Sequence, residues 1–208
     1  MLEQFQDNNI ENDHIETNDF ENSKSFEDEF VNFKEINEYI SVMDASVIEA
    51  HTQEIAHEII ENKLNENWEN IPLEERMERC DQLFEIFSDK LEIPADFDIE
   101  VLKENEFGYF DGYRVVMNVE HLENDSFDKV LDTMAHECRH AYQQECMSKD
   151  LDSYSGEYRG EIEGWKEAVN DYSYFTGFCD YHYSAIEQDA REYANNVLIS
   201  VLKNGGAQ

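Results

Sequence analysis

The spacing of apolar residues changes twice along this 208-residue chain, and this change constrains its fold more than any other feature. In segments 44–69 and 72–94 apolar residues recur every three to four positions, which is typical of amphipathic helices. Between about 96 and 120 they alternate with polar residues, as they do in half-buried strands. Helical spacing then returns in 126–147, 157–172 and 184–202. The sequence therefore predicts a helix-rich α+β fold with one small sheet.

An Asp111-Gly112 pair divides the strand-like region into two β-prone runs, 107–110 and 113–119. Asp-Gly favours a two-residue hairpin turn of type I′, because that turn needs positive φ at both central positions. Another strand is expected around residues 97–101, where apolar and acidic residues alternate. We therefore expect a mainly antiparallel sheet, with the strand 113–119 as the edge that an extended peptide could join.

The charge of the chain is strongly one-sided, since 50 acidic residues against 15 lysines and arginines give a net charge of −35. Such a surface repels phosphates and anionic lipids, which argues against binding to nucleic acid or to membranes. No segment is apolar enough to span a bilayer, and the first residues do not resemble a signal peptide. These features predict a cytoplasmic protein, and a basic partner or cationic substrate stays open.

Residues 1–40 hold twelve acidic side chains against Lys24 and Lys34. A segment of this composition buries too little apolar area to offset the entropy of ordering the chain, so we expect it to be largely disordered. The folded domain is then expected over residues 41–208. The acidic segment could engage a basic protein partner, or it could be a solvated tail.

Residues His136-Glu137-Cys138-Arg139-His140 form the pattern HExxH inside the predicted helix 126–147. Residues four apart lie above one another on one face of an α-helix, so both imidazoles can reach one ion at the ~2.0–2.1 Å of Zn–N bonds. Glu137 borders the same face, where it can take a proton from a metal-activated water. The pattern predicts a Zn²⁺ site with His136 and His140 as ligands and Glu137 as the catalytic general base. The alternative without a metal is an amphipathic helix with two surface histidines.

A catalytic zinc usually has a third protein ligand, which must come from another part of the chain. Glu187 is the best candidate, because it adjoins an apolar stripe near the start of the predicted helix 184–202. Asp189 is the rival ligand, or it could hold a ligand histidine through the second ring N–H. Both carboxylates could also simply suit the positive end of the helix dipole. His182 and Tyr183, just before this helix, could contact the transition state or could be packing residues.

HExxH followed by Glu187-x-Asp189-Ala190-x-x-Tyr193-Ala194 resembles the gluzincin type of zincin metallopeptidases, and more narrowly the ImmA/IrrE-like group. The resemblance covers about residues 107–202. It implies a zincin-like fold, in which a small sheet packs on the HExxH helix with its edge strand along the peptide substrate. It also implies three zinc ligands, namely His136, His140 and Glu187. The interval between His140 and Glu187 is long and aromatic-rich, and no DNA-binding helix-turn-helix accompanies it.

We therefore expect a zinc metallopeptidase, a hydrolase that cleaves a peptide or protein substrate with Glu137 as general base. The alternative from another class is a non-catalytic zincin scaffold whose acidic surface binds a basic partner. The presence of Glu137 argues against it, because a non-catalytic site does not need that carboxylate. A third possibility is an acidic helical protein in which HExxH is accidental, and the zinc content of the protein separates it from the others.

Overall fold

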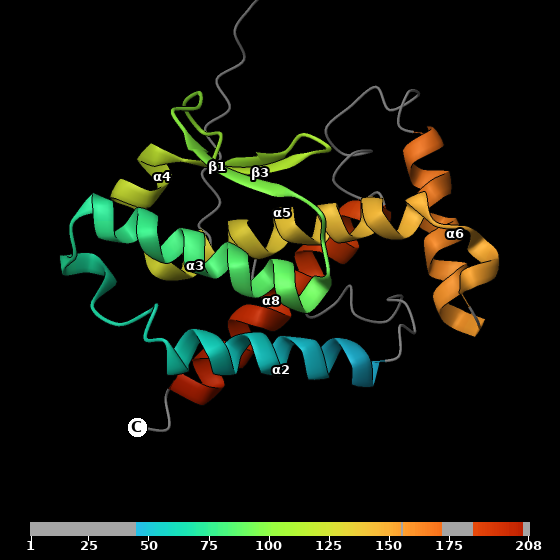
Figure 1. Cartoon of the computed structure of the whole chain (residues 1–208), viewed down its shortest axis with the longest axis horizontal. Coiled ribbons are helices and arrows are strands. Elements are labelled where there is room, and N and C mark those ends of the chain that lie inside the picture. Colours follow the sequence, from blue (N-terminus) through green and yellow to red (C-terminus); the bar gives the residue numbers. More distant parts are fainter. Residues whose placement is uncertain (1–44, 155, 172–184, 206–208) are drawn as a thin grey trace, which may run out of the picture. The chain divides into compact units, whose positions relative to one another are not determined.

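The computed structural model describes residues 45–154, 156–171 and 185–205 (Figure 1). The helices are α2 (Ala45–Glu61), α3 (Leu73–Leu91), α4 (Val119–Asn124), α5 (Phe127–Ser148), α6 (Gly156–Asp171) and α8 (Ala185–Gly205). The strands are β1 (Asp96–Glu100), β2 (Gly108–Phe110) and β3 (Arg114–Asn118). This confirms the predicted α+β class, with much helix and one small sheet. The predicted acidic segment 1–40 and its boundary lie outside the described residues, so they stay predictions.

The helices begin close to their predicted positions, because the signals that start them are local. Pro72 takes extended backbone immediately before α3, where its missing N–H is not needed. The first predicted helix ends early, at Glu61 instead of position 69. Lys63 and Asn67 beyond it adopt left-handed backbone, with φ of 58° and 57°, which a right-handed helix cannot accommodate. The hydrophobic spacing continued past the point where the backbone turned.

The sheet is mixed, with strand order β1-β3-β2. Strands β2 and β3 pair antiparallel, which confirms the predicted hairpin, but β1 pairs with β3 in parallel. The expectation of a mainly antiparallel sheet is therefore corrected, and so is the expectation that residues 113–119 form an edge. The physical reason is the position of β2. It lies between β1 and β3 in sequence, but in the sheet it pairs with the side of β3 that faces away from β1, so β3 is the central strand. Among the residues that the structure describes, β1 and β2 are therefore the edge strands of the sheet.

The hairpin turn forms one residue later than the Asp-Gly pair suggested. The backbone N–H of Asp111 donates to the carbonyl of Arg114, so Gly112 and Tyr113 are the two loop residues. Of the residues in this turn only Gly112 has positive φ, at 95°, whereas type I′ needs two such residues. The Asp111 side chain explains the shift, because its Oδ1 accepts the backbone N–H groups of Tyr113 and Arg114 at 2.9 and 2.8 Å.

One face of the sheet packs on α5 (Figure 1). Val115 and Met117 of β3 are fully buried in the same core as Leu131 and Met134 of α5. Each such side chain stabilises the fold by roughly 1.5–3 kcal/mol through removal of apolar surface from water. Strand β2 runs so close to α5 that a Cβ added at Gly108 would stand 3.0 Å from Thr133 Cγ2. The sheet thus lies directly against the helix that carries the HExxH pattern.

Helix α8 packs against both α5 and α2 (Figure 1). Ala190, Ala194, Val197 and Val201 are buried along one side of α8, which confirms the predicted apolar stripe. Glu187 is also buried, with 4% of its surface exposed. Within 45–154, 156–171 and 185–205, no helix combines the length and apolar character needed to cross a membrane.

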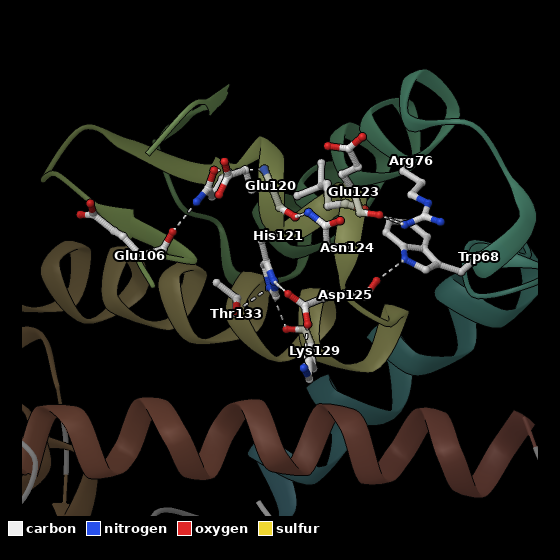
Figure 2. A network of polar contacts seen from close by, with 12 residues as sticks. Trp68, Arg76, Glu106, Glu120, His121, Glu123, Asn124, Asp125, Lys129 and Thr133 are labelled. Atoms are coloured by element: carbon white, nitrogen blue, oxygen red, sulfur yellow. Dashed lines mark hydrogen bonds and ion pairs between the residues drawn. The ribbon is translucent and has the colours of Figure 1, made fainter. Parts of the chain in front are cut away.

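A buried polar network joins α4 to the start of α5 (Figure 2). His121 of α4 is 3% exposed, and its Nδ1 lies 2.9 Å from Asp125 Oδ2. Its Nε2 lies 3.1 Å from Thr133 Oγ1 and 3.3 Å from the Lys129 carbonyl oxygen. The Arg76 guanidinium donates to two carbonyls near the end of α4, at 2.8 and 2.9 Å. Groups of α3 and α5 therefore supply the polar contacts that hold this short helix, which sequence spacing did not predict.

Candidate metal centre

Two imidazoles project from the same face of α5. His136 and His140 are four residues apart, and their Nε2 atoms are 3.0 Å from one another. The rings stand almost perpendicular, with an interplanar angle of 86° and 4.6 Å between centroids. The predicted placement of both imidazoles on one helix face is therefore confirmed, because the i, i+4 spacing directs their two Nε2 atoms at one point.

Glu187 brings a carboxylate to this point from α8. Its Oε1 lies 3.3 Å from His140 Nε2, and its Oε2 lies 3.5 Å from His136 Nε2. One donor atom of each of the three residues lies within 4.8 Å of the other two. Four ligands at ~2.0–2.1 Å around a tetrahedral ion stand roughly 3.3 Å apart. The three side chains therefore form a group that can hold a metal ion.

Glu137 lies beside this group without being one of its donors. It is partly buried, and its carboxylate accepts a hydrogen bond from the backbone N–H of Phe110 in β2. Burial raises the pKa of Glu137 above its usual value, since it penalises the charged form, and the Glu187 charge acts in the same direction. The two histidines and the Phe110 N–H oppose this increase but do not cancel it. A carboxylate of raised pKa is suited to accept a proton during a reaction.

The two variable positions of HExxH face the core. Cys138 is fully buried and Arg139 is 2% exposed. The Arg139 Nε and Nη2 atoms donate to Asp189 Oδ2 and Oδ1 at 2.8 and 2.9 Å, so the pair is bidentate. Three aromatic rings surround the guanidinium at 4.7–5.4 Å from its carbon to the ring centroids, and they belong to Tyr142, Trp165 and Tyr193. Arg139 thus connects α5 with α6 and α8.

The structure distinguishes the two carboxylates that the sequence left open. Glu187 forms the possible metal-binding group together with His136 and His140, which we call the donor group. Asp189 lies outside the donor group and accepts hydrogen bonds from Arg139 and from Gln143 Nε2 at 2.6 Å. The second ring nitrogen of His140 contacts Gln143 Oε1 at 2.8 Å, so Asp189 reaches this histidine only through Gln143. Sequence reasoning missed Gln143. The available signal was a polar residue one turn beyond His140, on a helix whose other inward positions are mostly apolar.

Two further predicted site residues, His182 and Tyr183, lie outside the described residues, so their roles stay predictions. A residue that sequence reasoning did not single out, Arg191, stands one helical turn after Glu187. Its Nη1 lies 3.5 Å from Glu187 Oε2, which places a permanent positive charge beside the acidic donor.

Comparisons of the chain with protein-family models, with curated proteins and with solved structures found no match. The resemblance to zincins therefore depends on the two sequence motifs and on the metal-binding group that they form in space. Membership of the gluzincins or of the ImmA/IrrE-like group stays a prediction.

Proposed function

We propose that this chain is a zinc-dependent peptidase in which His136, His140 and Glu187 are the metal ligands and Glu137 is the general base. One observation carries the proposal. Two imidazole nitrogens from α5 and a carboxylate oxygen from α8 converge, and the Glu137 carboxylate, whose pKa is raised, lies beside them. Two histidines and one glutamate are a ligand set of hydrolytic zinc sites that leaves a position for water.

The side chains present can perform the proton transfers of peptide hydrolysis. When bound to such a ligand set, zinc lowers the pKa of a coordinated water to about 7 and polarises a carbonyl group. Glu137 would take the proton of the attacking water and return it to the leaving amine. The hydrogen bond from the Phe110 N–H holds its carboxylate toward β2. Its raised pKa lowers the free-energy cost of the protonated state through which this transfer passes.

The position of β2 as an edge strand of the described sheet supports a place for the substrate. Phe107 and Asp111 make backbone hydrogen bonds to Asn118 and Arg114, the last and first residues of β3. Because the direction of the backbone groups alternates along a strand, those of Gly108 and Phe110 point away from β3. The Phe110 N–H is already hydrogen-bonded to Glu137, so an extended peptide could pair with the backbone groups of Gly108 and with the Phe110 carbonyl by strand addition, beside Glu137. In this proposal β2 replaces the strand 113–119 as the substrate edge.

Metal analysis and a peptide library test the proposal on the full chain. We expect one zinc per chain, and none in a His140→Ala variant. A Glu137→Gln variant should retain the zinc and lose about 10²–10⁴-fold in cleavage rate, the usual contribution of general base catalysis. A chain that binds no zinc, or a Glu137→Gln variant as active as the unaltered chain, contradicts the proposal.

The net charge of −35 favours a second candidate, a non-catalytic scaffold that binds a basic protein partner. The same experiment separates the two candidates. If the unaltered chain and Glu137→Gln both bind zinc and neither cleaves any peptide, the scaffold is favoured. A Glu137 carboxylate held beside the donors argues for the peptidase, because a scaffold gains nothing from the cost of desolvating it.

A further inference from the structure

We infer that Gln143 is a positioning residue, which orients the His140 ring for metal binding and ties that ring to helix α8. The inference rests on the metal site of the proposed function, but not on peptidase turnover. It concerns a residue of α5 that lies one turn beyond HExxH and outside the donor group.

The amide of Gln143 is fully buried and makes three contacts. Its Oε1 lies 2.8 Å from His140 Nδ1. Its Nε2 donates to the carbonyl oxygen of Ile186 at 2.9 Å and to Asp189 Oδ2 at 2.6 Å. Both N–H groups of the amide are therefore used, and both partners belong to α8.

These partners leave the amide only one orientation. A carbonyl oxygen and a carboxylate oxygen can only accept hydrogen bonds, so the NH₂ group must face Ile186 and Asp189. The reversed amide would set its oxygen against two acceptor oxygens and would remove the hydrogen bond that each of them receives from Gln143. The Oε1 atom therefore faces His140 Nδ1, and Nδ1 must be the donor. A lone pair of Nε2 is then the one available to a metal, on the side where His136 and Glu187 lie.

Gln143 also contacts both of the helices that supply metal donors. Ile186, whose carbonyl it binds, immediately precedes Glu187, and Asp189 follows two residues later. The bidentate contact with Arg139 fixes Asp189 in turn, and the exposed fractions are only 3% for the Arg139 side chain and 13% for the Asp189 side chain. One amide therefore restrains the His140 ring and the backbone that carries Glu187. Loss of this amide should loosen two of the three donors.

Contacts of this kind, one bond away from a ligand, usually change metal affinity by about 10–100-fold when they are removed. Gln144 offers a matched control on the same helix. Its Nε2 donates to the Gly112 carbonyl at 2.8 Å, and no hydrogen bond from its side chain to His136, His140 or Glu187 is described. A general effect of losing a glutamine from α5 should appear equally at positions 143 and 144.

Zinc affinity of the full chain, measured by competition with a chromophoric chelator, tests the inference. Gln143→Met keeps the length of the side chain and removes its hydrogen bonds. We expect it to bind zinc about 10–100-fold more weakly than the unaltered chain, with an unchanged circular dichroism spectrum. Gln144→Met should stay within about twofold of the unaltered chain. Equal affinity in Gln143→Met, or equal weakening in both variants, overturns the inference.

Nitrogen-15 NMR of the histidine rings gives a readout that does not depend on activity. In the unaltered chain we expect a His140 Nδ1–H signal protected from solvent exchange, and zinc coordination through Nε2. If Gln143→Met does not fold, this measurement on the unaltered chain decides, and coordination through Nδ1 overturns the inference. Unchanged affinity in Gln143→Met removes only the role of Gln143. Weakened affinity without any peptide cleavage removes only the peptidase, and a chain that binds no zinc removes both.

Discussion

His121 and His140 each stand in a helix beside a carboxylate, yet their ring nitrogens have different surroundings. At His121 the protein satisfies both nitrogens, since Nδ1 contacts Asp125 and Nε2 contacts Thr133 Oγ1 and a backbone carbonyl (Figure 2). At His140 only Nδ1 has such a partner, the amide of Gln143. Its Nε2 instead faces a second imidazole nitrogen at 3.0 Å and a carboxylate oxygen at 3.3 Å.

The difference teaches that the kind of partner separates a structural histidine from a candidate metal ligand, whereas spacing does not. His121 and Asp125 are four residues apart in sequence, as are His136 and His140. In the first pair a donor meets an acceptor, and the contact is complete within the protein. In the second pair the nitrogens and the Glu187 oxygen bring lone pairs to one point, which favours a proton or a cation between them. Four tests can break or sharpen this contrast.

The largest contrast should come from replacing each histidine by alanine. We expect His140→Ala to lose bound zinc entirely while the chain stays folded. His121→Ala should keep its zinc and lose on the order of 2–3 kcal/mol of unfolding free energy, because it leaves a cavity and removes the partner of Asp125. Metal analysis and urea denaturation measure the two effects. Loss of zinc in a folded His121→Ala chain would erase the distinction.

Glu137→Gln should separate function from stability at the metal centre. On the proposed mechanism it lowers the cleavage rate by about 10²–10⁴-fold and leaves zinc bound. The pKa of Glu137 is raised in the folded chain. Protonated Glu137 therefore contributes to stability fully at pH values below the pKa of the unfolded chain, about 4.3, and this contribution is lost as the pH rises through the pKa of the folded chain. At neutral pH, chelator-treated Glu137→Gln should therefore unfold at a higher urea concentration than the parent. A lower midpoint contradicts this.

Asp125→Asn should have the opposite dependence on pH. Burial acts to raise the pKa of Asp125, but hydrogen bonds from Lys129 and His121 outweigh it, and the pKa is lowered. The stabilisation is then full above the unfolded value of about 3.9 and is lost as pH falls through the folded value. We expect the variant to be about 1–2 kcal/mol less stable at pH 7, with a smaller difference below pH ~3. Denaturation across this pH range measures it, and a difference independent of pH would refute it.

The smallest effect should come from Thr133→Val. This change removes the hydroxyl that contacts His121 Nε2 at 3.1 Å, and it should cost about 1 kcal/mol of unfolding free energy. Thr133 stands three residues before His136 on the same helix, so its replacement tests whether the two histidine sites are independent. We expect zinc affinity within twofold of the parent. A larger change in affinity would show that the sites are coupled.

Much of the fold follows from local signals in the sequence. Periodicity and Pro72 place the helices, and Asp111 with Gly112 places the hairpin. The parallel pairing of β1 with β3 could not be predicted in this way, because it depends on where β2 lies in space. The predicted type I′ turn was wrong because the Asp111 side chain accepts hydrogen bonds from two backbone N–H groups, an interaction that competes with the type I′ conformation.

The candidate metal centre likewise has one part that the sequence predicts and another part that depends on tertiary structure. The face shared by His136 and His140 is a property of one helix and can be read from spacing alone. The choice between Glu187 and Asp189 is tertiary, since it depends on how α8 is rotated against α5. In the observed rotation the buried Arg139 binds Asp189, and Gln143 adds a second contact to it. The sequence does not indicate the partner of either residue, although a polar residue at position 143 among mostly apolar inward positions marks Gln143 itself.

The burial of Arg139 has a consequence for protein engineering. A transplant of the five residues 136–140 into an unrelated helix would carry two imidazoles and the Glu137 carboxylate, but it would leave a guanidinium without its own carboxylate partner and its aromatic surroundings. A transferable version of this centre must include the segment 186–189 from the facing helix and an amide three residues beyond the second histidine. The smallest unit that can be moved is thus a pair of helices.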